Sequence, residues 1–522
     1  MTTSSRAGAD SALDSLLAPL RRRVGRFELA VFGGAWLVSM LVHLYMFTHK
    51  FLNHDDLDGL YSGCEFGLSS GRWLLQPVTR LIGGFSSSWL HALFGTLFFA
   101  LSMVLTVRLL RLRHPLLILL FVTCCAAFPT VASTYAYMFC SAQYLLAMLL
   151  ATAAACCIHG GRAWGIALGG VCLALSMGCY QAYFPLAAAL LVLALLLDAL
   201  EERYAGYRPF FFAGLKCVLG LALGLALYLV ILRVCLAVTG TELVSYQGIG
   251  SMGQVTPAAL ARRFVKTLSA FTDTFRSSGG IYHRVFPALA AASYLLSTVA
   301  LAVVAAQRGM LRRPRTCLPA LTALVLLPLA SNLVYVMTEP ETVHQVMIFP
   351  QVLPLLLPCL LADRIRRPSA PRARRAAAAL TAALVLSQSA LAYEFVYVTN
   401  RAYFYMDVTY ENAYAFMNRL AAKLELQEGY TRDTPVALIG GAYMGGYIPS
   451  PGMTGVITGN DALNMYSRAW LFPYLLGADF RFAGPQREGE LKQTEEFRAM
   501  PCYPDSGSIR WIDGVLVVKL SD

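Results

Sequence analysis

The chain has 522 residues, of which 57% are hydrophobic and 14% are charged, and its mean hydropathy is +0.57. Soluble globular domains carry about 25% charged residues, so this composition excludes a string of ordinary soluble domains and predicts an integral membrane protein. The net charge is +12. Its basic residues lie between apolar segments, where they orient a chain in a bilayer, so membrane lipids rather than nucleic acids are the expected partners.

Apolar segments long enough for a helix to cross the hydrocarbon core recur along residues 1–397. Eleven are expected, at residues 28–48, 88–107, 115–133, 140–158, 164–181, 184–200, 210–235, 286–306, 317–337, 345–362 and 376–397. The first is as long as a full span and lacks a clear small-residue cleavage site, so it is not read as a cleavable signal. Residues 1–397 are therefore predicted to form an all-α polytopic domain.

The loops between these segments alternate in charge. One set carries the basic residues, at Arg21–Arg26, Arg108–Arg113, Arg162, Arg203–Arg208, Arg308–Arg315 and Arg364–Arg375. The short loops of the other set, 134–139, 182–183 and 338–344, contain no Lys or Arg. The positive-inside rule places the basic set and the N-terminus in the cytoplasm. An odd number of spans then places the C-terminus outside.

Residues 398–522 have an ordinary charge density and a different pattern. Pro435–Gly441 is a strand-like run, and Asp513-Gly514 between two β-branched runs is a hairpin signal. With a helix-forming stretch at 413–426, this region is predicted to be a small extracytoplasmic α/β domain. One hypothesis is that a disulfide between Cys64 and Cys502 ties it to the first outer loop.

An acidic cluster, Asn53-His54-Asp55-Asp56, directly follows the first span. Repulsion between adjacent carboxylates raises one pKa and leaves a competent base. The loop continues as an amphipathic stretch, Leu60–Ile82, expected to lie at the membrane interface, and it carries Arg72. The alternative interpretation is a solvated loop in which Asn-His-Asp caps a helix.

Two further outer loops and two aromatic turns offer candidate binding residues. Arg263 and Lys266 suit a lipid phosphate or, equally, bulk anionic headgroups. His344, with Glu339 and Glu341 before it, belongs to a site or to a polar turn, and the turn is favoured. The turns at Tyr135–Tyr137 and Tyr180–Tyr183 line a cavity or form interfacial aromatic belts, and belts are favoured for most of these residues.

The motifs Asn53–Asp56, Ser70-Gly71-Arg72-Trp73 and Gly178-Cys179-Tyr180-Gln181, with Tyr503–Ile509 near the end, together resemble a known family. The chain is similar to the bacterial serotype-converting O-antigen glucosyltransferases, membrane enzymes of the GT-C class. The resemblance implies an undecaprenyl-phosphate-glucose donor, a surface polysaccharide or lipid-linked glycan acceptor, and a site on the outer face of the bacterial cytoplasmic membrane. The arginine that such a family would place before the tenth span is replaced here by Glu339-Pro340-Glu341 and His344.

The resemblance implies that Asp55 or Asp56 is the general base. The donor phosphate is expected on Arg72 first, with Arg263, Lys266 and His344 behind it. His54, Tyr180 and Gln181 are expected to line the cavity. No cofactor is firmly predicted, although adjacent carboxylates also suit Mg²⁺ or Mn²⁺.

Two alternatives to this function remain open. A transporter or flippase of lipid-linked sugars predicts ionisable residues at mid-bilayer depth, whereas Lys216, Arg233 and Asp198 fall near span ends. A polysaccharide polymerase or ligase would concentrate arginines in one large outer loop. The acid pair after the first span favours the transferase.

Overall fold

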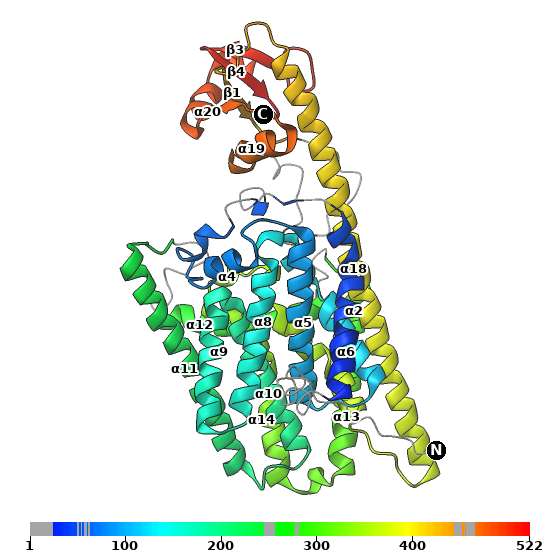
Figure 1. Ribbon diagram of the computed structural model, residues 1–522. Coiled ribbons are helices and arrows are strands. Elements are labelled where there is room, and N and C mark those ends of the chain that lie inside the picture. The colour runs from blue at the N-terminus through cyan, green and yellow to red at the C-terminus, as the bar shows by residue number, and fades with distance from the viewer. Residues whose placement is uncertain are drawn as a thin grey trace, which may run out of the picture.

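The computed structural model describes residues 25–49, 52–53, 55–56, 60, 63–244, 256–276, 281–442, 452–453, 455 and 465–522. Apolar helices form a bundle, and a small sheet-containing unit stands above one end of it (Figure 1). In the described residues, seven helices are long and apolar enough to cross a membrane, or eight if the bent pair α6–α7 is one span. The protein is therefore a membrane protein of mainly helical structure.

The helices of the bundle cover the predicted apolar segments. They are α2 (Arg26–Thr48), α4 (Leu75–Ile82), α5 (Ser88–Leu110), α6 (Pro115–Ala127), α7 (Pro129–Ala136), α8 (Met138–His159), α9 (Ala163–Cys179), α10 (Phe184–Leu200), α11 (Tyr207–Thr239), α12 (Pro257–Arg276), α13 (Phe286–Gln307), α14 (Pro314–Ser331), α15 (Val334–Met337), α16 (Val352–Leu355), α17 (Leu357–Ala362) and α18 (Pro371–Glu425). The expected number of eleven spans is not reached among the described residues, and the predicted span 317–337 is divided between α14 and α15.

The predicted span 345–362 is wrong as one continuous helix. It consists of two 3₁₀ turns, η6 (Gln345–Met347) and η7 (Phe349–Gln351), followed by the short helices α16 and α17. Pro350, Pro354 and Pro358 recur every four residues through it. Each proline removes a backbone N–H donor and clashes with the preceding turn, so the chain bends repeatedly while staying buried.

Loops that the sequence assigned to one side of the membrane meet at one end of the bundle. Asp198, at the end of α10, lies 2.8 Å from Arg111 Nη2 and 2.8 Å from His159 Nε2. Glu201 pairs with Arg111 at 3.2 Å and with Arg364 at 3.1 Å. Side chains from three further segments, which carry Arg111, His159 and Arg364, therefore converge on two carboxylates, as expected if these loops share one side.

Replacing Asp198 is expected to destabilise this end of the bundle. The carboxylate is 5% exposed, and removing one partner from a buried ion pair costs about 3–5 kcal/mol because the other charges stay buried. Asp198→Asn should therefore lower the midpoint of thermal unfolding in detergent by several degrees. Arg203→Gln is the matched control, since this side chain is 51% exposed and an exposed pair contributes about 1 kcal/mol or less. Equal shifts in the two variants would contradict the prediction.

The helix α18 joins the bundle to the sheet-containing unit. Its 55 residues run without interruption through the predicted domain boundary at 397/398. At 1.5 Å per residue it is about 80 Å long, against a hydrocarbon core about 30 Å thick. The helix therefore projects well beyond the bundle, as Figure 1 shows along one edge of the molecule, and it carries the C-terminal unit with it.

The C-terminal unit has the predicted α/β character. Its sheet has the order β2-β1-β4-β3. The strands are β1 (Pro435–Ile439), β2 (Arg481–Phe482), β3 (Ile509–Ile512) and β4 (Val515–Lys519). β1 pairs in parallel with β2 and β4, and β3 pairs with β4 in an antiparallel hairpin. Asp513 and Gly514 both have positive φ, 46° and 74°, which is the two-residue turn that the Asp-Gly signal predicted.

Helices cover both faces of this sheet. The short helices α20 (Pro485–Lys492) and α21 (Glu495–Arg498) supply Leu491 and Phe497 to one face. The upper end of α18 and α19 (Met465–Leu471) cover the other. Leu52, which is 5% exposed, belongs to this second core, and Leu60 packs against it. The acid loop that follows α2 is thus anchored in the C-terminal unit at both of its ends.

Candidate functional site

The acid loop begins with a side-chain cap. Asn53 Oδ1 accepts hydrogen bonds from the backbone N–H groups of Asp55 at 2.9 Å and Asp56 at 2.8 Å. This is the capping arrangement of the alternative interpretation. The amide Nδ2 of Asn53 also donates to the carbonyl of Ala136, at the end of α7. Asn53 therefore fixes both the shape of the loop and its position on the bundle, while His54 lies outside the described residues.

The Asp56 carboxyl is completely buried. Its Oδ1 accepts from the backbone N–H of Phe139 at 2.9 Å and from the Ser86 hydroxyl at 3.4 Å, and its Oδ2 lies 3.4 Å from the Asn53 N–H. A solvated loop is therefore wrong for this residue. Burial raises the pKa of Asp56 to about 7, and the neighbouring charge of Asp55 adds least to the rise. Loss of solvation, rather than the predicted repulsion between carboxylates, is the main cause.

The raised pKa predicts a pH-dependent stability. Between pH about 4 and about 7 the folded protein holds the Asp56 proton and the unfolded chain releases it, so stability falls as pH rises through this window. Three units of pKa correspond to about 4 kcal/mol. Thermal unfolding of wild type and Asp56→Asn in detergent, from pH 4 to pH 8, measures the effect. As the pH rises from about 4 to about 7, the wild type should lose stability relative to Asp56→Asn. Parallel plots of unfolding midpoint against pH for the two proteins would refute the raised pKa of Asp56.

Arg72 forms the second part of the site. Its side chain is buried, donating from Nη1 to the Tyr144 hydroxyl at 2.7 Å and from Nε to Gln181 Oε1 at 3.4 Å. The guanidinium carbon lies 4.9 Å from the centre of the Tyr180 ring, and that ring stacks on Tyr144 with centroids 4.0 Å apart. Of the residues predicted from sequence, the structure thus brings together Arg72, Tyr180 and Gln181. Gln181 Nε2 in turn donates to the Ser70 carbonyl at 3.0 Å.

Two motifs that are more than a hundred residues apart pack directly on each other here. The backbone N–H of Leu74 donates to the carbonyl of Gly178 at 2.9 Å. A Cβ on Gly178 would lie 2.7 Å from the Trp73 ring, so only glycine lets the two segments approach this closely. The motifs Ser70–Trp73 and Gly178–Gln181 therefore form one structural unit around Arg72.

The favoured interpretation of the aromatic turns as membrane-interface belts is wrong for most of them. Tyr135 and Tyr183 are fully buried, and Tyr180 is 3% exposed. They pack inside the protein, Tyr135 against His43 and Tyr183 against Tyr180. Belt residues would face lipid, whereas these rings support the site from within.

Cys64 lies close to both the acid loop and Arg72. Burial raises the pKa of its thiol to about 12, while the charges of Arg72 and Asp56 act on it in opposite directions. Both charged groups therefore lie within electrostatic range of this one thiol. The hypothesis of a disulfide with Cys502 is wrong, because both cysteines are free thiols.

The other three predicted phosphate-binding residues are Arg263, Lys266 and His344. The first two bond to residues other than those that surround Arg72. Arg263, on α12, is 7% exposed and donates to the carbonyl of Val336 at 3.3 Å. Lys266 pairs with Asp273 at 3.0 Å. Partial burial lowers the pKa of His344. The loop 338–344 has no arginine of its own, although the family resemblance predicts one there. Arg263, from α12, lies next to the start of this loop through its hydrogen bond to Val336.

A bend between α6 and α7 positions the acid loop, and sequence reasoning missed it. The two helices meet at 43° where Pro129 begins α7. The carbonyls freed at the bend accept from side chains of other helices: Ala126 from His43 Nε2 at 3.0 Å and Ala127 from Thr399 Oγ1 at 2.9 Å. A broken span needs such partners because no water reaches it.

The side chains at the bend also explain a histidine in an apolar span. Because His43 Nε2 donates to a carbonyl, its Nδ1 is the acceptor and receives the Tyr403 hydroxyl at 2.7 Å. From the bend, α7 leads to the Ala136 carbonyl and on to the Phe139 N–H, the two backbone groups that hold Asn53 and Asp56. The signal available in the sequence was Pro129 within an apolar segment, together with a polar residue at His43.

The divalent-ion variant stays a prediction. Among the described residues no group of three or more His, Cys, Asp or Glu side chains is placed to hold a metal ion. Asp56 Oδ1 accepts hydrogen bonds from Ser86 and from the Phe139 N–H.

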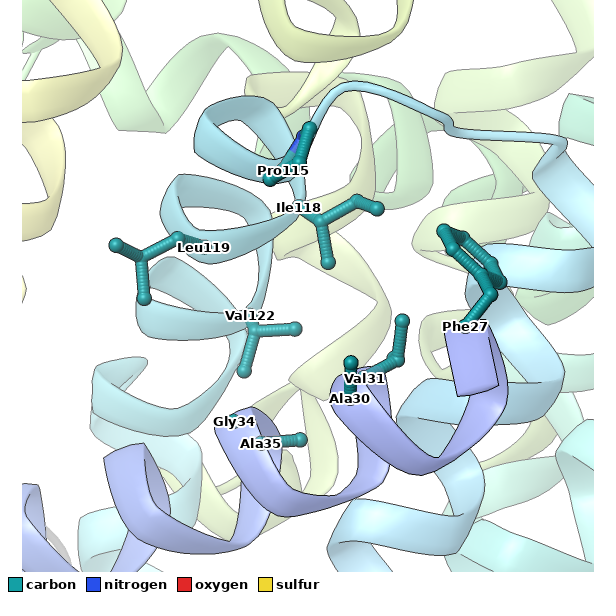
Figure 2. Close-up of a pocket in the computed structure, with 9 residues that line it drawn as sticks. All are labelled: Phe27, Ala30, Val31, Gly34, Ala35, Pro115, Ile118, Leu119 and Val122. Carbon is teal, nitrogen blue, oxygen red and sulfur yellow. The ribbon is translucent and has the colours of Figure 1, made fainter. Parts of the chain in front are cut away.

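Figure 2 shows a different hollow, which has no chemistry of its own. It is a groove of about 160 Å³ between α2 and α6, near Phe27 and Pro115. Its nine lining residues are all apolar or glycine, so in a membrane protein it is a surface for lipid chains. The polar candidate residues lie instead near the opposite ends of these helices, in the acid loop and at α7.

A family model described as glucosyl transferase GtrII matches residues 44–355. The chain belongs to this family. The matched range contains the acid loop, Arg72 and its partners, and the bend at α7, so the site lies wholly within the GtrII region. The comparisons with curated proteins and with solved structures gave no match. The resemblance inferred from the motifs is thereby confirmed, and the GtrII family identifies the chain as a membrane glucosyltransferase.

Proposed function

We propose that the protein transfers glucose from a polyprenyl-phosphate donor to a surface polysaccharide such as O-antigen, on the outer face of the bacterial cytoplasmic membrane. The observation that carries the proposal is that the acid loop and Arg72 lie at one end of the bundle. Arg72 is buried there against the Tyr180 ring and hydrogen-bonded to Tyr144 and Gln181. The basic loops lie at the other end. Gln181 precedes α10 and Asp198 ends it, so the two ends are about 25 Å apart along this helix.

This arrangement suits a GT-C-type enzyme with its N-terminus in the cytoplasm and its C-terminal unit outside. Outside the cytoplasm there is no pool of nucleotide sugars, so a lipid must deliver the donor. The site lies between helix ends, within reach of a lipid-borne phosphate. Glucosyltransferase family membership supports the reaction class, and the separation of the acid loop from the basic loops supports a site on the outer side.

In the proposed reaction an acceptor hydroxyl attacks the anomeric carbon of the donor glucose. The new glycosidic C–O bond forms as the bond between that carbon and the phosphate oxygen breaks, and polyprenyl phosphate leaves with the electron pair. Arg72 stabilises the negative charge on the leaving phosphate through its guanidinium N–H groups. Tyr180 and Gln181 hold the guanidinium in place, and Arg263 and Lys266 add positive charge farther along the outer face.

The proton of the acceptor hydroxyl passes to a carboxylate of the acid loop. Asp55 is the better candidate for this base, because its side chain is half-buried whereas Asp56 is fully buried and accepts hydrogen bonds from Phe139 and Ser86. A general base must come within hydrogen-bond reach of the proton it removes. Asp56 then acts as a positioning residue that holds the loop on α8.

Transfer of radiolabelled glucose in reconstituted vesicles tests the function. Polyprenyl-phosphate glucose is supplied with a lipid-linked glycan acceptor, and label in the glycan is measured. A nucleotide-sugar donor, without the polyprenyl carrier, should give no label. EDTA should leave the rate unchanged. Movement of labelled donor across the bilayer with no label in the glycan would instead support the transporter or flippase, and would overturn the proposal.

A further inference from the structure

The C-terminal unit exposes a pair of parallel aromatic rings. Trp470, on α19, is 38% exposed, and Tyr474, in the following π-helical turn Phe472–Leu476, is 45% exposed. Their ring planes differ by 6° and their centroids are 5.5 Å apart. Exposed aromatic side chains gathered on one surface are typical of binding sites.

Core packing does not account for this pair. The residues between them, Leu471 and Phe472, are 2% and 0% exposed and anchor the segment in the core of the unit. Trp470 and Tyr474 lie on the opposite side, facing away from that core. π-helical turns are rare and occur frequently at functional sites. Trp470 and Tyr474 are therefore two partly exposed rings on a segment that Leu471 and Phe472 anchor in the core of the unit.

The helix of the C-terminal unit that carries Trp470 lies near the bundle. Figure 1 shows α19 on the side of this unit that faces the outer loops. The chain that leads into α19 touches the bundle beside the acid loop: Met453 is buried in the core of the bundle, and a Cβ on Gly455 would lie 2.8 Å from the Ala136 side chain. Ten residue steps separate Gly455 from Met465, a reach of at most ~35 Å.

We propose that Trp470 and Tyr474 form a subsite for the distal sugars of the acceptor glycan; this rests on the proposed function. A sugar ring presents a face of C–H groups that packs on an aromatic ring, while its hydroxyls suit the indole N–H and the phenol O–H at the ring edges. In this proposal the acceptor glycan extends from its reacting hydroxyl near Asp55 toward the two rings. The ligand is therefore an oligosaccharide, and its recognition depends on length.

Acceptors of different length test the subsite. Transfer is measured with a single-repeat acceptor and with one of several repeats, for wild type, Trp470→Ala and Tyr474→Ala. For the long acceptor KM should rise about 3- to 10-fold, while kcat, the donor KM and the single-repeat KM stay unchanged. Trp511→Ala is the matched control, since this ring is 43% exposed in the same unit and its Nε1 donates to the Glu428 carbonyl at 3.1 Å.

Three results would overturn the subsite: an unchanged KM for the long acceptor, an equal rise for the short one, or an equal rise in the Trp511→Ala control. Binding of the long glycan without donor, followed by tryptophan fluorescence, separates this proposal from the enzymatic one. If the wild type binds the glycan but transfers no glucose, and Trp470→Ala abolishes the binding, the subsite stands and the proposed function is refuted. Loss of vesicle association in Trp470→Ala with unchanged glycan binding would assign the rings to the lipid surface and refute the subsite.

Discussion

Asp55→Asn is expected to abolish glucose transfer while leaving the protein folded. The half-buried carboxylate is the proposed acceptor of the proton, and removal of a positioned general base costs typically about 10²–10⁴-fold in rate. The loss should appear in kcat, with the KM values of donor and acceptor little changed, because asparagine keeps the size of the side chain and the backbone hydrogen bond to Asn53. Initial rates of label transfer in vesicles give both parameters.

Asp56→Asn separates the roles of the two carboxylates. Asparagine retains an oxygen that can accept from the Phe139 N–H, so the loop should keep its position and the rate should fall by about tenfold or less. Glu65→Gln, an exposed acid of the same outer loop, is the matched control and should match wild type. If Asp56→Asn is the inactive variant and Asp55→Asn retains full activity, the assignment of the base is reversed.

Arg72→Met is expected to have the second large effect. Arg72 is the buried cation proposed to stabilise the leaving phosphate, and removing one such preorganised donor costs about 10²–10³-fold in kcat. Arg72→Lys keeps the charge and loses the planar fork that donates to Tyr144 and Gln181. It should therefore recover part of the rate, because lysine binds phosphate as a point charge.

The controls for Arg72 distinguish binding from folding. Thermal unfolding of each variant in detergent should show that the bundle persists, since the methionine side chain fills much of the space beside the stacked Tyr144 and Tyr180 rings. Arg262→Gln changes an exposed arginine on the outer helix α12 and should leave transfer unaffected. Transfer by Arg72→Met within twofold of wild type would remove this residue from the mechanism.

Several features were determined by the sequence alone, because they depend on local composition and spacing. Apolar length indicated where the long apolar helices lie, since a helix must cover the hydrocarbon core over consecutive residues, although eleven spans were expected and seven or eight of the described helices are long enough. The turn at Asp513-Gly514 followed from the positive φ angles that these residue types tolerate. The motifs around Asp55, Arg72 and Gln181 pointed to the glucosyltransferase family that the family model then showed.

Tertiary structure alone decided what surrounds each of these residues. The burial that raises the pKa of Asp56 comes from α7 and α8, and the clamp on Arg72 joins segments 109 residues apart. His43 and Tyr403 meet across 360 residues to support the bend that carries Ala136. Leu52 enters the core of the C-terminal unit, which no property of its neighbours in the chain indicates. The solvation, electrostatics and hydrogen-bond partners of a residue depend on which segments pack together. Hydrophobic periodicity predicts only the secondary structure of each segment and which of its faces is buried.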